Sequence, residues 1–281
     1  MWSRRTLLAA GTLALAHNAG ADPAEPAPAR VGQGATTLAV EISGYPLVFV
    51  WLRIDGRQVR ALIDTGSASP VRLSSRLAQD LKLPLEPVAG STVQGLDGRR
   101  LTVQRGMVDT LEMGNSIDRA VEIDVAGDRI ESVAAQVGTT FDVVLGWGFL
   151  SRRDFVLDYR QRQLHFGGRL QGPGTTGVGF GYTIVNRLPV VPARWGTQGI
   201  TLLFDTGAPM CNIDAAFANT PPGQVIARDV MLGTTQLSLQ WRAKDLGVTR
   251  KALGTVGTLG NNLFGRYAVV VDTRKQRILL D

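Results

Sequence analysis

Short apolar runs with strand-like alternation, separated by turn residues, make up most of the chain beyond residue 36. Residues 38–42 alternate apolar and polar side chains, residues 47–54 form a longer apolar run, and the Asp55-Gly56 step after it is typical of a hairpin turn. Residues 74–81 have spacing compatible with a short helix. The pattern predicts a mainly β protein with a few short helices, and the 33 glycines and 13 prolines agree because they favour turns.

One stretch of this pattern occurs twice. Residues 61–67 read Ala-Leu-Ile-Asp-Thr-Gly-Ser and residues 202–208 read Leu-Leu-Phe-Asp-Thr-Gly-Ala, so Asp64 and Asp205 each end an apolar strand and enter a tight Thr-Gly turn. A single Asp-Thr-Gly tripeptide is also typical of an ordinary strand-ending turn. Two copies in matching apolar surroundings indicate a more specific arrangement.

The match extends well beyond the two turns. A Leu-Gly step followed by a short apolar segment comes after each, at Gly146 and Gly260, and an aspartate follows each glycine after 12 positions. Phe-Val-Leu-Asp-Tyr-Arg at residues 155–160 then aligns with Val-Val-Val-Asp-Thr-Arg at residues 269–274. This internal duplication has a period too long for a solenoid, and it predicts two copies of one small β domain.

The paired aspartates suggest a specific chemistry. If the two copies pack face to face about a pseudo-two-fold axis, Asp64 and Asp205 meet and share one proton, because two like charges so close cannot both ionise cheaply. The pair can then hold a water, with the ionised carboxylate taking its proton and the protonated one polarising a scissile carbonyl. Threonine hydroxyls can fix such turns, and glycine lets backbone approach a carboxylate where a Cβ would clash. The turn residues that would support the site are Thr65, Gly66, Ser67, Thr206, Gly207 and Ala208.

These segments resemble those of aspartic proteases of the pepsin and retropepsin superfamily. Asp64-Thr65-Gly66-Ser67 and Asp205-Thr206-Gly207-Ala208 match the catalytic loops, and the two Leu-Gly segments match the second conserved loop of each half. The resemblance covers both halves of the chain: each repeat is as short as a retropepsin subunit, but both lie on one polypeptide, as in pepsin. It implies an all-β, bilobal fold of two retropepsin-like β-barrel lobes with the active cleft between them. It also implies that each motif threonine hydrogen-bonds across the lobe junction and that Ser67 bonds the first carboxylate.

Two departures from the pepsin pattern carry consequences. Ala208 stands where pepsins usually have a hydroxyl, as in retropepsins, which removes one hydrogen bond to the ionised aspartate and predicts a less acidic pH optimum. In addition, 55 positions separate Asp205 from Gly260, against 82 from Asp64 to Gly146. We therefore expect only the first lobe to carry a full flap over the substrate.

The expected flap is a hairpin over residues 93–101 with a glycine-rich tip. The candidate flap residues are Gly95, Leu96, Asp97 and Gly98, whose two glycines would let the tip bend as the flap opens and closes. The segment has no tyrosine, so the flap hydroxyl that is usual in pepsins is missing. An ordinary surface hairpin is the alternative, and we assign no chemistry to this segment.

The remaining segments complete the expected domain organisation. Residues 1–21 have the positively charged start, apolar run and small-residue cleavage site of an export signal, in an order that resembles a twin-arginine signal. An anchor that is not cleaved is the alternative. The expected parts are the signal at 1–21, a flexible leader or short propeptide at 22–36, the first lobe at 37–166, a glycine-rich linker at 167–181 and the second lobe at 182–281. We therefore expect a periplasmic or secreted protein without stable membrane insertion once the signal is removed.

Charge and composition argue against several other classes of function. The formal net charge is +6, but the basic residues are scattered without interleaved aromatic residues, so we expect no nucleic-acid binding. No metal or other cofactor is indicated, because one of the two histidines lies in the export signal and the single cysteine, Cys211, lies in a strand-like run typical of a buried side chain. The linker glycines are not followed by the Gly-Lys-Ser/Thr of a nucleotide-binding loop.

These observations favour an exported, monomeric aspartic endopeptidase that hydrolyses a peptide or protein substrate without a cofactor, with Asp64 and Asp205 as the catalytic residues. Two alternatives stay open. A peptide-binding protein could keep the fold without activity, although binding alone needs no proton-sharing pair. A dimer of two-lobed chains could place its sites between chains, although the glycine linker and the unequal lobe lengths favour pairing within one chain.

Overall fold

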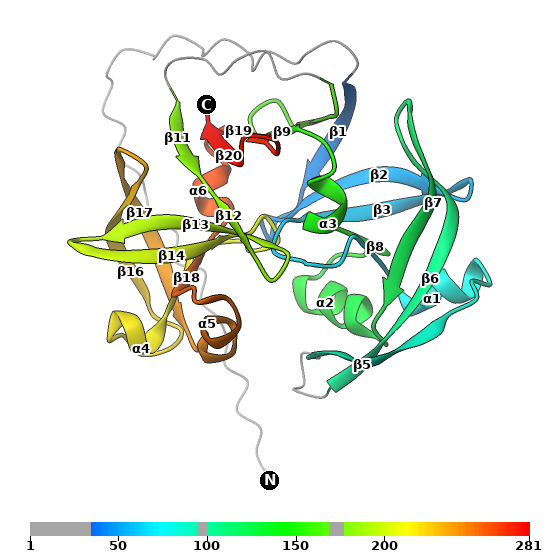
Figure 1. Cartoon of the computed structure of the whole chain (residues 1–281), viewed down its shortest axis with the longest axis horizontal. Helices are drawn as coiled ribbons and strands as arrows, with labels where there is room; N and C mark the ends of the chain where they lie inside the picture. The colour runs from blue at the N-terminus through cyan, green and yellow to red at the C-terminus, as the bar shows by residue number, and fades with distance from the viewer. Residues whose placement is uncertain (1–34, 95–99, 169–176) are drawn as a thin grey trace.

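The computed structural model describes residues 35–94, 100–168 and 177–281. Several expected segments lie outside this part of the chain: the export signal, the leader up to residue 34, the flap tip at residues 95–99 and residues 169–176 of the linker. Figure 1 shows the described residues as two β barrels side by side, with a third sheet that joins them along the top of the view.

The first barrel closes six strands into a ring. Its strands, in chain order, are β2 (Val48–Ile54), β3 (Arg57–Asp64), β4 (Val71–Leu73), β6 (Arg100–Met113), β7 (Ser116–Val125) and β8 (Val143–Gly146). Their order around the ring is β2-β3-β8-β4-β7-β6, and the pairs Arg53↔Glu112 and Ile54↔Leu111 return β6 to β2. β5 (Glu86–Gln94) pairs with β6 outside the ring and forms the other arm of the expected flap hairpin.

The second barrel repeats this topology. Its strands are β13 (Leu188–Trp195), β14 (Gln198–Phe204), β15 (Asn212–Asp214), β16 (Val225–Leu232), β17 (Thr235–Lys244) and β18 (Gly257–Leu259). The order β13-β14-β18-β15-β17-β16 is that of the first barrel, and β16 closes the ring on β13. β12 (Thr183–Val185) pairs antiparallel with β13 outside the ring. The described second lobe has no strand that corresponds to β5, as expected if only the first lobe carries a flap.

The third sheet joins the two lobes and contains strands from both. It is formed by β1 (Thr36–Ile42), β9 (Phe155–Asp158), β10 (Gln163–Phe166), β11 (Val178–Gly181), β19 (Ala268–Asp272) and β20 (Arg277–Leu280). Their order is β11-β20-β19-β9-β10-β1, so β9 of the first lobe pairs directly with β19 of the second. In this antiparallel pair Val156 lies opposite Val270, which is its own counterpart in the sequence duplication. The pseudo-two-fold axis of the molecule therefore passes between these two valines.

This sheet also changes one expected boundary. The segment 167–181 is predicted as a linker, but Val178–Gly181 form β11 and pair with β20. The glycines there lack side chains that would mark a strand, and the pairing is with the far end of the chain. The local sequence pattern therefore does not predict strand β11.

Six short helices complete the described structure: α1 (Ser75–Asp80), α2 (Arg129–Val137), α3 (Trp147–Leu150), α4 (Ala215–Ala218), α5 (Gly247–Leu253) and α6 (Asn261–Phe264). The helix predicted at 74–81 is confirmed as α1, which begins where the Ser74 hydroxyl accepts the N–H of Leu77. α2 packs on the outer face of the first barrel through Ile130, which is buried against Leu62 and Val144. No helix in the described ranges is long and apolar enough to cross a membrane.

Apolar packing continues from one lobe into the other behind the two Thr-Gly turns. Trp147 of the first lobe meets the rings of Tyr182 and Phe204 edge-on, with centroids 5.3 and 6.4 Å apart. Phe204 packs in turn on Phe264 at 5.0 Å. The two barrels therefore share one hydrophobic core, to which side chains of both lobes contribute.

A buried carboxylate adds a polar link between the lobes. Asp154, just before β9, is 5% exposed. One of its oxygens accepts the N–H and the hydroxyl of Thr273 in the second lobe at 2.9 and 2.8 Å, and the other accepts Arg274 at 2.9 Å. Three bonds thus fasten the turn between β19 and β20 to the opposite lobe.

We predict that Asp154→Ala lowers the free energy of unfolding by about 2–4 kcal/mol, because it removes a buried charged acceptor and leaves the partly buried N–H and hydroxyl of Thr273 without their partner. Urea denaturation followed by tryptophan fluorescence measures this change. Asp80→Ala is the matched control: its pair with Arg57 is exposed, and its loss should cost about 0.5 kcal/mol or less. Equal losses in the two variants would show that the Asp154 link contributes nothing special.

Candidate active site

Asp64 and Asp205 leave equivalent strands of the two barrels. Asp64 is the last residue of β3, where the parallel neighbour β8 aligns it with Gly146. Asp205 directly follows β14, which pairs in parallel with β18, and its N–H donates to the carbonyl of Leu259 at 3.2 Å. Both aspartates therefore start a turn at the same point of the barrel.

Four reciprocal hydrogen bonds lock the two turns together. The Thr65 hydroxyl donates to the carbonyl of Phe204 at 2.8 Å, and the Thr206 hydroxyl donates to that of Ile63 at 2.9 Å. In return, each threonine hydroxyl accepts the backbone N–H of the other threonine, at 3.0 and 2.9 Å. Both threonines are fully buried, so no water competes for these bonds. These are the contacts across the lobe junction that the resemblance to aspartic proteases implies.

The two motif glycines let the carboxyl groups approach each other. Each glycine N–H donates to the aspartate of its own turn at 2.9 Å, Gly66 to Asp64 and Gly207 to Asp205. A Cβ on Gly66 would overlap the Asp205 carboxyl group, and a Cβ on Gly207 would overlap that of Asp64. The two carboxyl groups lie close enough for each to shift the pKa of the other. The structure thus brings together the two aspartates that the sequence singles out.

Burial and mutual repulsion control how this pair titrates. Burial is the largest cause at both residues and raises the pKa of Asp64 and that of Asp205. At Asp205 the negative charge of Asp64 raises the pKa further, well above the ordinary value. At Asp64 the positive charges of Arg72 and Arg129 oppose the effect of burial. Two buried carboxyl groups this close titrate as a pair, and they hold one proton between them more readily than they hold two negative charges.

The Leu-Gly segments support both turns in the same way. After Gly146, the N–H of Trp147 donates to the carbonyl of Ser67 at 2.8 Å. After Gly260, the N–H of Asn261 donates to the carbonyl of Ala208 at 2.9 Å. Each Leu-Gly segment thus hydrogen-bonds to the residue that follows the glycine of one Asp-Thr-Gly turn.

A buried polar chain at the second turn has no counterpart at the first. Asn261 is 4% exposed and donates to the carbonyls of Thr206 and Pro46 at 2.9 and 2.6 Å, while it accepts the hydroxyl of Tyr159 at 2.7 Å. Burial and the charge of Asp205 raise the pKa of Tyr159 well above its usual value, so this hydroxyl stays a donor. Neither residue belongs to a motif that the sequence predicts as part of the site. Their signal is a departure from the duplication, which places tryptophan where Asn261 stands and threonine where Tyr159 stands.

Two expected details at the turns have different outcomes. Ala208 is buried and offers no hydroxyl to Asp205, as its side chain dictates. The Ser67 hydroxyl, which the resemblance places on Asp64, makes no hydrogen bond to that carboxylate among the described residues; Ser67 instead uses its backbone, donating to the Asp64 carbonyl at 3.1 Å. Within the motifs, each carboxylate is therefore held by a glycine N–H rather than by a hydroxyl.

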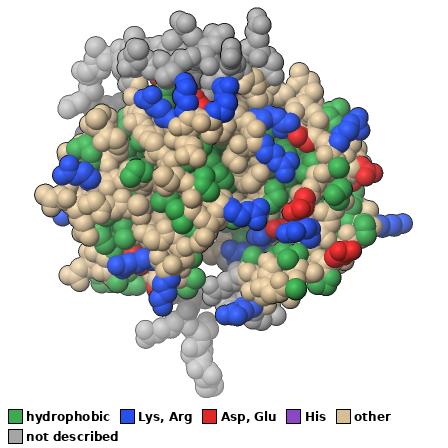
Figure 2. Space-filling view, in the orientation of Figure 1, with side chains coloured by type: hydrophobic (Ala, Val, Ile, Leu, Met, Phe, Trp, Pro, Cys, Tyr) green, Lys and Arg blue, Asp and Glu red, His purple; other side chains and the backbone are tan. Residues whose placement is uncertain are grey.

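Basic residues near the pair are the second feature that the sequence analysis missed. Figure 2 shows Lys and Arg side chains on both lobes of this face, some of them beside the hollow between the lobes. Arg72 and Arg129 act on Asp64, and Lys244 acts on Asp205. In the sequence these residues are scattered, and only the fold collects them.

Neither a metal centre nor the expected flap tip adds to this site. Within the described ranges no group of His, Cys, Asp or Glu side chains is arranged to hold a metal ion. Cys211 is fully buried, as predicted, and burial raises the pKa of its thiol to about 12. Residues Gly95 to Gly98 of the candidate flap lie outside the described chain, so their placement stays a prediction.

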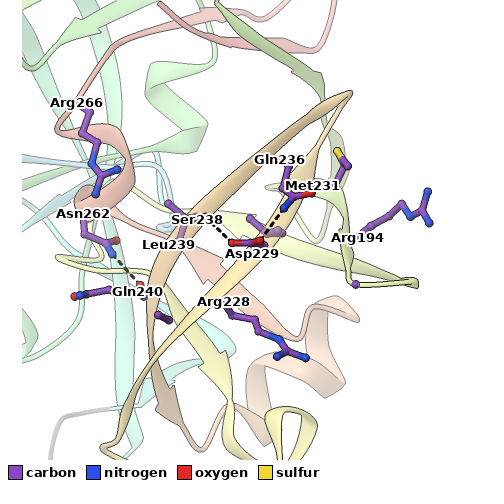
Figure 3. Close-up of a pocket in the computed structure, with 13 residues that line it drawn as sticks. Arg194, Arg228, Asp229, Met231, Gln236, Ser238, Leu239, Gln240, Asn262 and Arg266 are labelled. Atoms are coloured by element: carbon purple, nitrogen blue, oxygen red, sulfur yellow. Dashed lines mark hydrogen bonds between the residues drawn. The ribbon is translucent and has the colours of Figure 1, made fainter. Parts of the chain in front are cut away.

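A separate recess of about 820 Å³ lies on the outer face of the second barrel, beside β16 and β17 (Figure 3). Its lining includes Arg194, Arg228, Arg266 and Asp229, and neither motif aspartate reaches it. Asp229 is already bonded to side chains of β17, as the dashed lines show. We assign no role to this recess.

Comparison with known proteins agrees with the geometry of the first lobe. Residues 50–149 match the family described as aspartyl protease, and this range runs from β2 to α3 with the first Asp-Thr-Gly turn and its Leu-Gly segment inside it. Among curated protein sequences, none matches this chain significantly. The second barrel repeats the topology of the matched one. The family match covers the first lobe, about a third of the chain, and the bilobal all-β fold is consistent with the aspartic protease superfamily.

Proposed function

We propose that the protein is an aspartic endopeptidase that hydrolyses peptide bonds with a water activated between Asp64 and Asp205. The observation that carries the proposal is the meeting of two buried carboxyl groups on equivalent turns, where burial raises the pKa of both. A pair of this kind raises the energy of the folded state and has no use in a protein that only binds.

The proposed chemistry gives the two carboxyl groups different protonation states. Asp64, ionised, takes a proton from the water as its oxygen attacks the scissile carbonyl carbon, and Asp205, protonated, donates a hydrogen bond to the carbonyl oxygen. This gives a tetrahedral intermediate. When the C–N bond breaks, the leaving nitrogen takes the proton that Asp64 received, and the pair returns to its starting state. No cofactor enters any step.

The bonds around the pair keep it ready for this reaction. The threonine bonds fix the spacing of the carboxyl groups, and the two glycine N–H groups hold one oxygen of each. Because these donors are in place before substrate binds, little reorganisation is needed as charge moves in the transition state. One chain supplies both carboxyl groups, which supports a monomer that acts on a peptide or protein substrate.

The N-terminal sequence supports a place of action outside the cytoplasm. We propose that residues 1–21 direct export and that the mature enzyme works in the bacterial cell envelope or beyond it. Whether residues 22–36 delay activity as a propeptide is decided by comparing the enzyme with and without them.

We predict that Asp64→Asn and Asp205→Asn each lower kcat/KM for peptide cleavage by about 10²–10⁴-fold, because each removes one partner of the proton transfer. A mixed peptide library incubated with the mature protein and analysed by mass spectrometry measures this loss. Asp80→Asn, on the surface of α1, is the control and should cleave as the wild type does.

Other outcomes would point to other functions. A folded, monodisperse wild type that cuts nothing would favour a catalytically silent peptide-binding protein. A loss in only one of the two variants would contradict the shared pair. Activity that appears only in dimers would favour sites formed between chains.

We predict that activity declines on the alkaline side only at a pH above the usual pKa range of carboxyl groups. The proposed reaction needs Asp205 protonated, and burial together with the charge of Asp64 raises the pKa of Asp205. Initial rates between pH 3 and 8 locate this decline. Ala208→Ser adds a hydroxyl that can donate to ionised Asp205, and it should move the decline to lower pH. A wild type active only at strongly acidic pH would be the opposite of this expectation.

The same raised pKa links stability to pH. Folded Asp205 holds its proton more tightly than the unfolded chain does. Above the ordinary value of 3.8 the unfolded chain loses this proton while the folded one keeps it. Unfolding then releases a proton, so the free energy of unfolding falls as pH rises, until the folded pair is deprotonated as well.

We predict that Asp205→Asn is more stable than the wild type at neutral pH and that this gain vanishes below about pH 4, where both states of the wild type hold the proton. The asparagine keeps an oxygen for the Gly207 N–H, so little structure is lost. Thermal unfolding at several pH values measures the difference, with Asp80→Asn as control. A gain that does not depend on pH would separate the stabilisation from titration of the pair.

A further inference from the structure

A row of side chains leads across the first barrel toward Asp64. In the registers of β3, β8, β4 and β7, Leu62 lies beside Val144, Val144 beside Arg72, and Arg72 beside Asp124. Asp64 stands two residues after Leu62 and therefore points to the same face of the sheet. The neighbours of Arg72 on β4 point the other way, because Val71 and Leu73 are buried in the barrel core. Arg72 thus lies on the surface that carries the proposed catalytic carboxylate.

Arg72 already has a partner. Its Nε and Nη2 donate to the two carboxylate oxygens of Asp124 at 2.6 and 3.1 Å. This bidentate salt bridge holds the guanidinium group in one orientation and neutralises most of its charge. By itself Arg72 offers little to a ligand.

Arg129 differs from Arg72 because no carboxylate among the described residues forms an ion pair with it. It opens α2, and the next residue, Ile130, is buried against Leu62 and Val144 of the same row. This packing sets the partly buried Arg129 close enough to Arg72 and Asp64 for each of them to act on its charge. Burial and the Arg72 charge lower the pKa of Arg129, and Asp64 only partly offsets them. No carboxylate in the described part of the chain lies within ion-pair distance of it.

The second lobe adds positive charge on its side of the pair. Its corresponding row is Leu203, Thr258, Asn212 and Arg242. Arg242 thus has the register position that Asp124 has in the first lobe. Lys244, two residues further on the same face of β17, acts on Asp205. Basic side chains therefore lie on both sides of the two aspartates.

We propose that Arg129, backed by the Arg72–Asp124 pair, binds a carboxylate of the substrate, so that the enzyme prefers peptides with an acidic group close to the bond that is cut. This inference rests on the proposed peptidase function. A partly buried guanidinium without a counter-ion is unfavourable, and a carboxylate from the substrate would supply two charge-assisted hydrogen bonds in a planar, specific arrangement. Basic walls would also raise the local concentration of acidic peptides before they bind.

The test is a set of matched peptides that differ at one group. In each pair, one position near the cleaved bond is Asp or Asn, and then Glu or Gln, with every other residue kept the same. A further pair carries either a free C-terminal carboxylate or a C-terminal amide. These arms distinguish an acidic side chain from a chain terminus as the source of the carboxylate.

We predict that the wild type cleaves the best acidic member about 10- to 100-fold faster in kcat/KM than its amide twin, and that Arg129→Gln lowers this ratio to about one. Because Arg129 also acts on Asp64, cleavage of the amide twin is expected to fall as well, so the ratio between the twins is the readout. Arg129→Lys should keep part of the preference, since it retains the charge but not the planar fork. Raising the salt concentration should reduce the ratio. Arg76→Gln is the control, because Arg76 is exposed and bonded to Asp142.

The outcomes separate this inference from the function on which it rests. Equal cleavage of acidic and amide peptides by the wild type would overturn the inference and leave the peptidase intact. An Arg129→Gln variant that loses all peptides equally would also overturn it, since Arg129 would then serve Asp64 alone. If no peptide is cleaved, the proposed function fails, and fluorescence anisotropy with the same labelled peptides still decides whether Arg129 binds the acidic member.

Discussion

The reciprocal hydrogen bonds between Thr65 and Thr206 are the constraint on which the rest of the structure depends. Two carboxyl groups repel each other as soon as both ionise, and burial makes either charge costly. They stay in contact because the turns that carry them are fastened to each other through buried bonds that no water can replace. Glycine on both sides is then obligatory, because a Cβ at either position would occupy the place of the opposite carboxyl group.

The sheet between the lobes makes this contact possible. Its central pair, β9 with β19, joins each residue to the symmetric position of the other lobe, so the two barrels meet in a single register. The shared aromatic packing of Trp147 with Phe204 and the Asp154 link to the second lobe lie on the same junction. A barrel that shifted by one residue would move its aspartate to the opposite face of the strand and lose the pair.

The sequence predicts the parts of this structure that are repeated or local. The two Asp-Thr-Gly turns, the Leu-Gly segments, the helix at α1 and the bilobal all-β fold follow from motifs, alternation and internal alignment. Features that depend on pairing between distant strands are not visible in the same way. β11 lies in a glycine-rich stretch and pairs with the last strand, and Arg72 and Arg129 lie 57 positions apart and meet only because α2 packs across the barrel.

The residues that the sequence analysis missed are also those that break the symmetry. A symmetric pair of carboxyl groups has no reason to place its proton on one side, so the surroundings must decide. Asp64 has two arginines beside it, whereas Asp205 has one lysine together with the negative charge of its partner. Asn261 and Tyr159 hold only the second turn. The repeated motif therefore provides two equivalent carboxyl groups, and the unrepeated side chains around it give them the different surroundings on which the proposed division into acid and base depends.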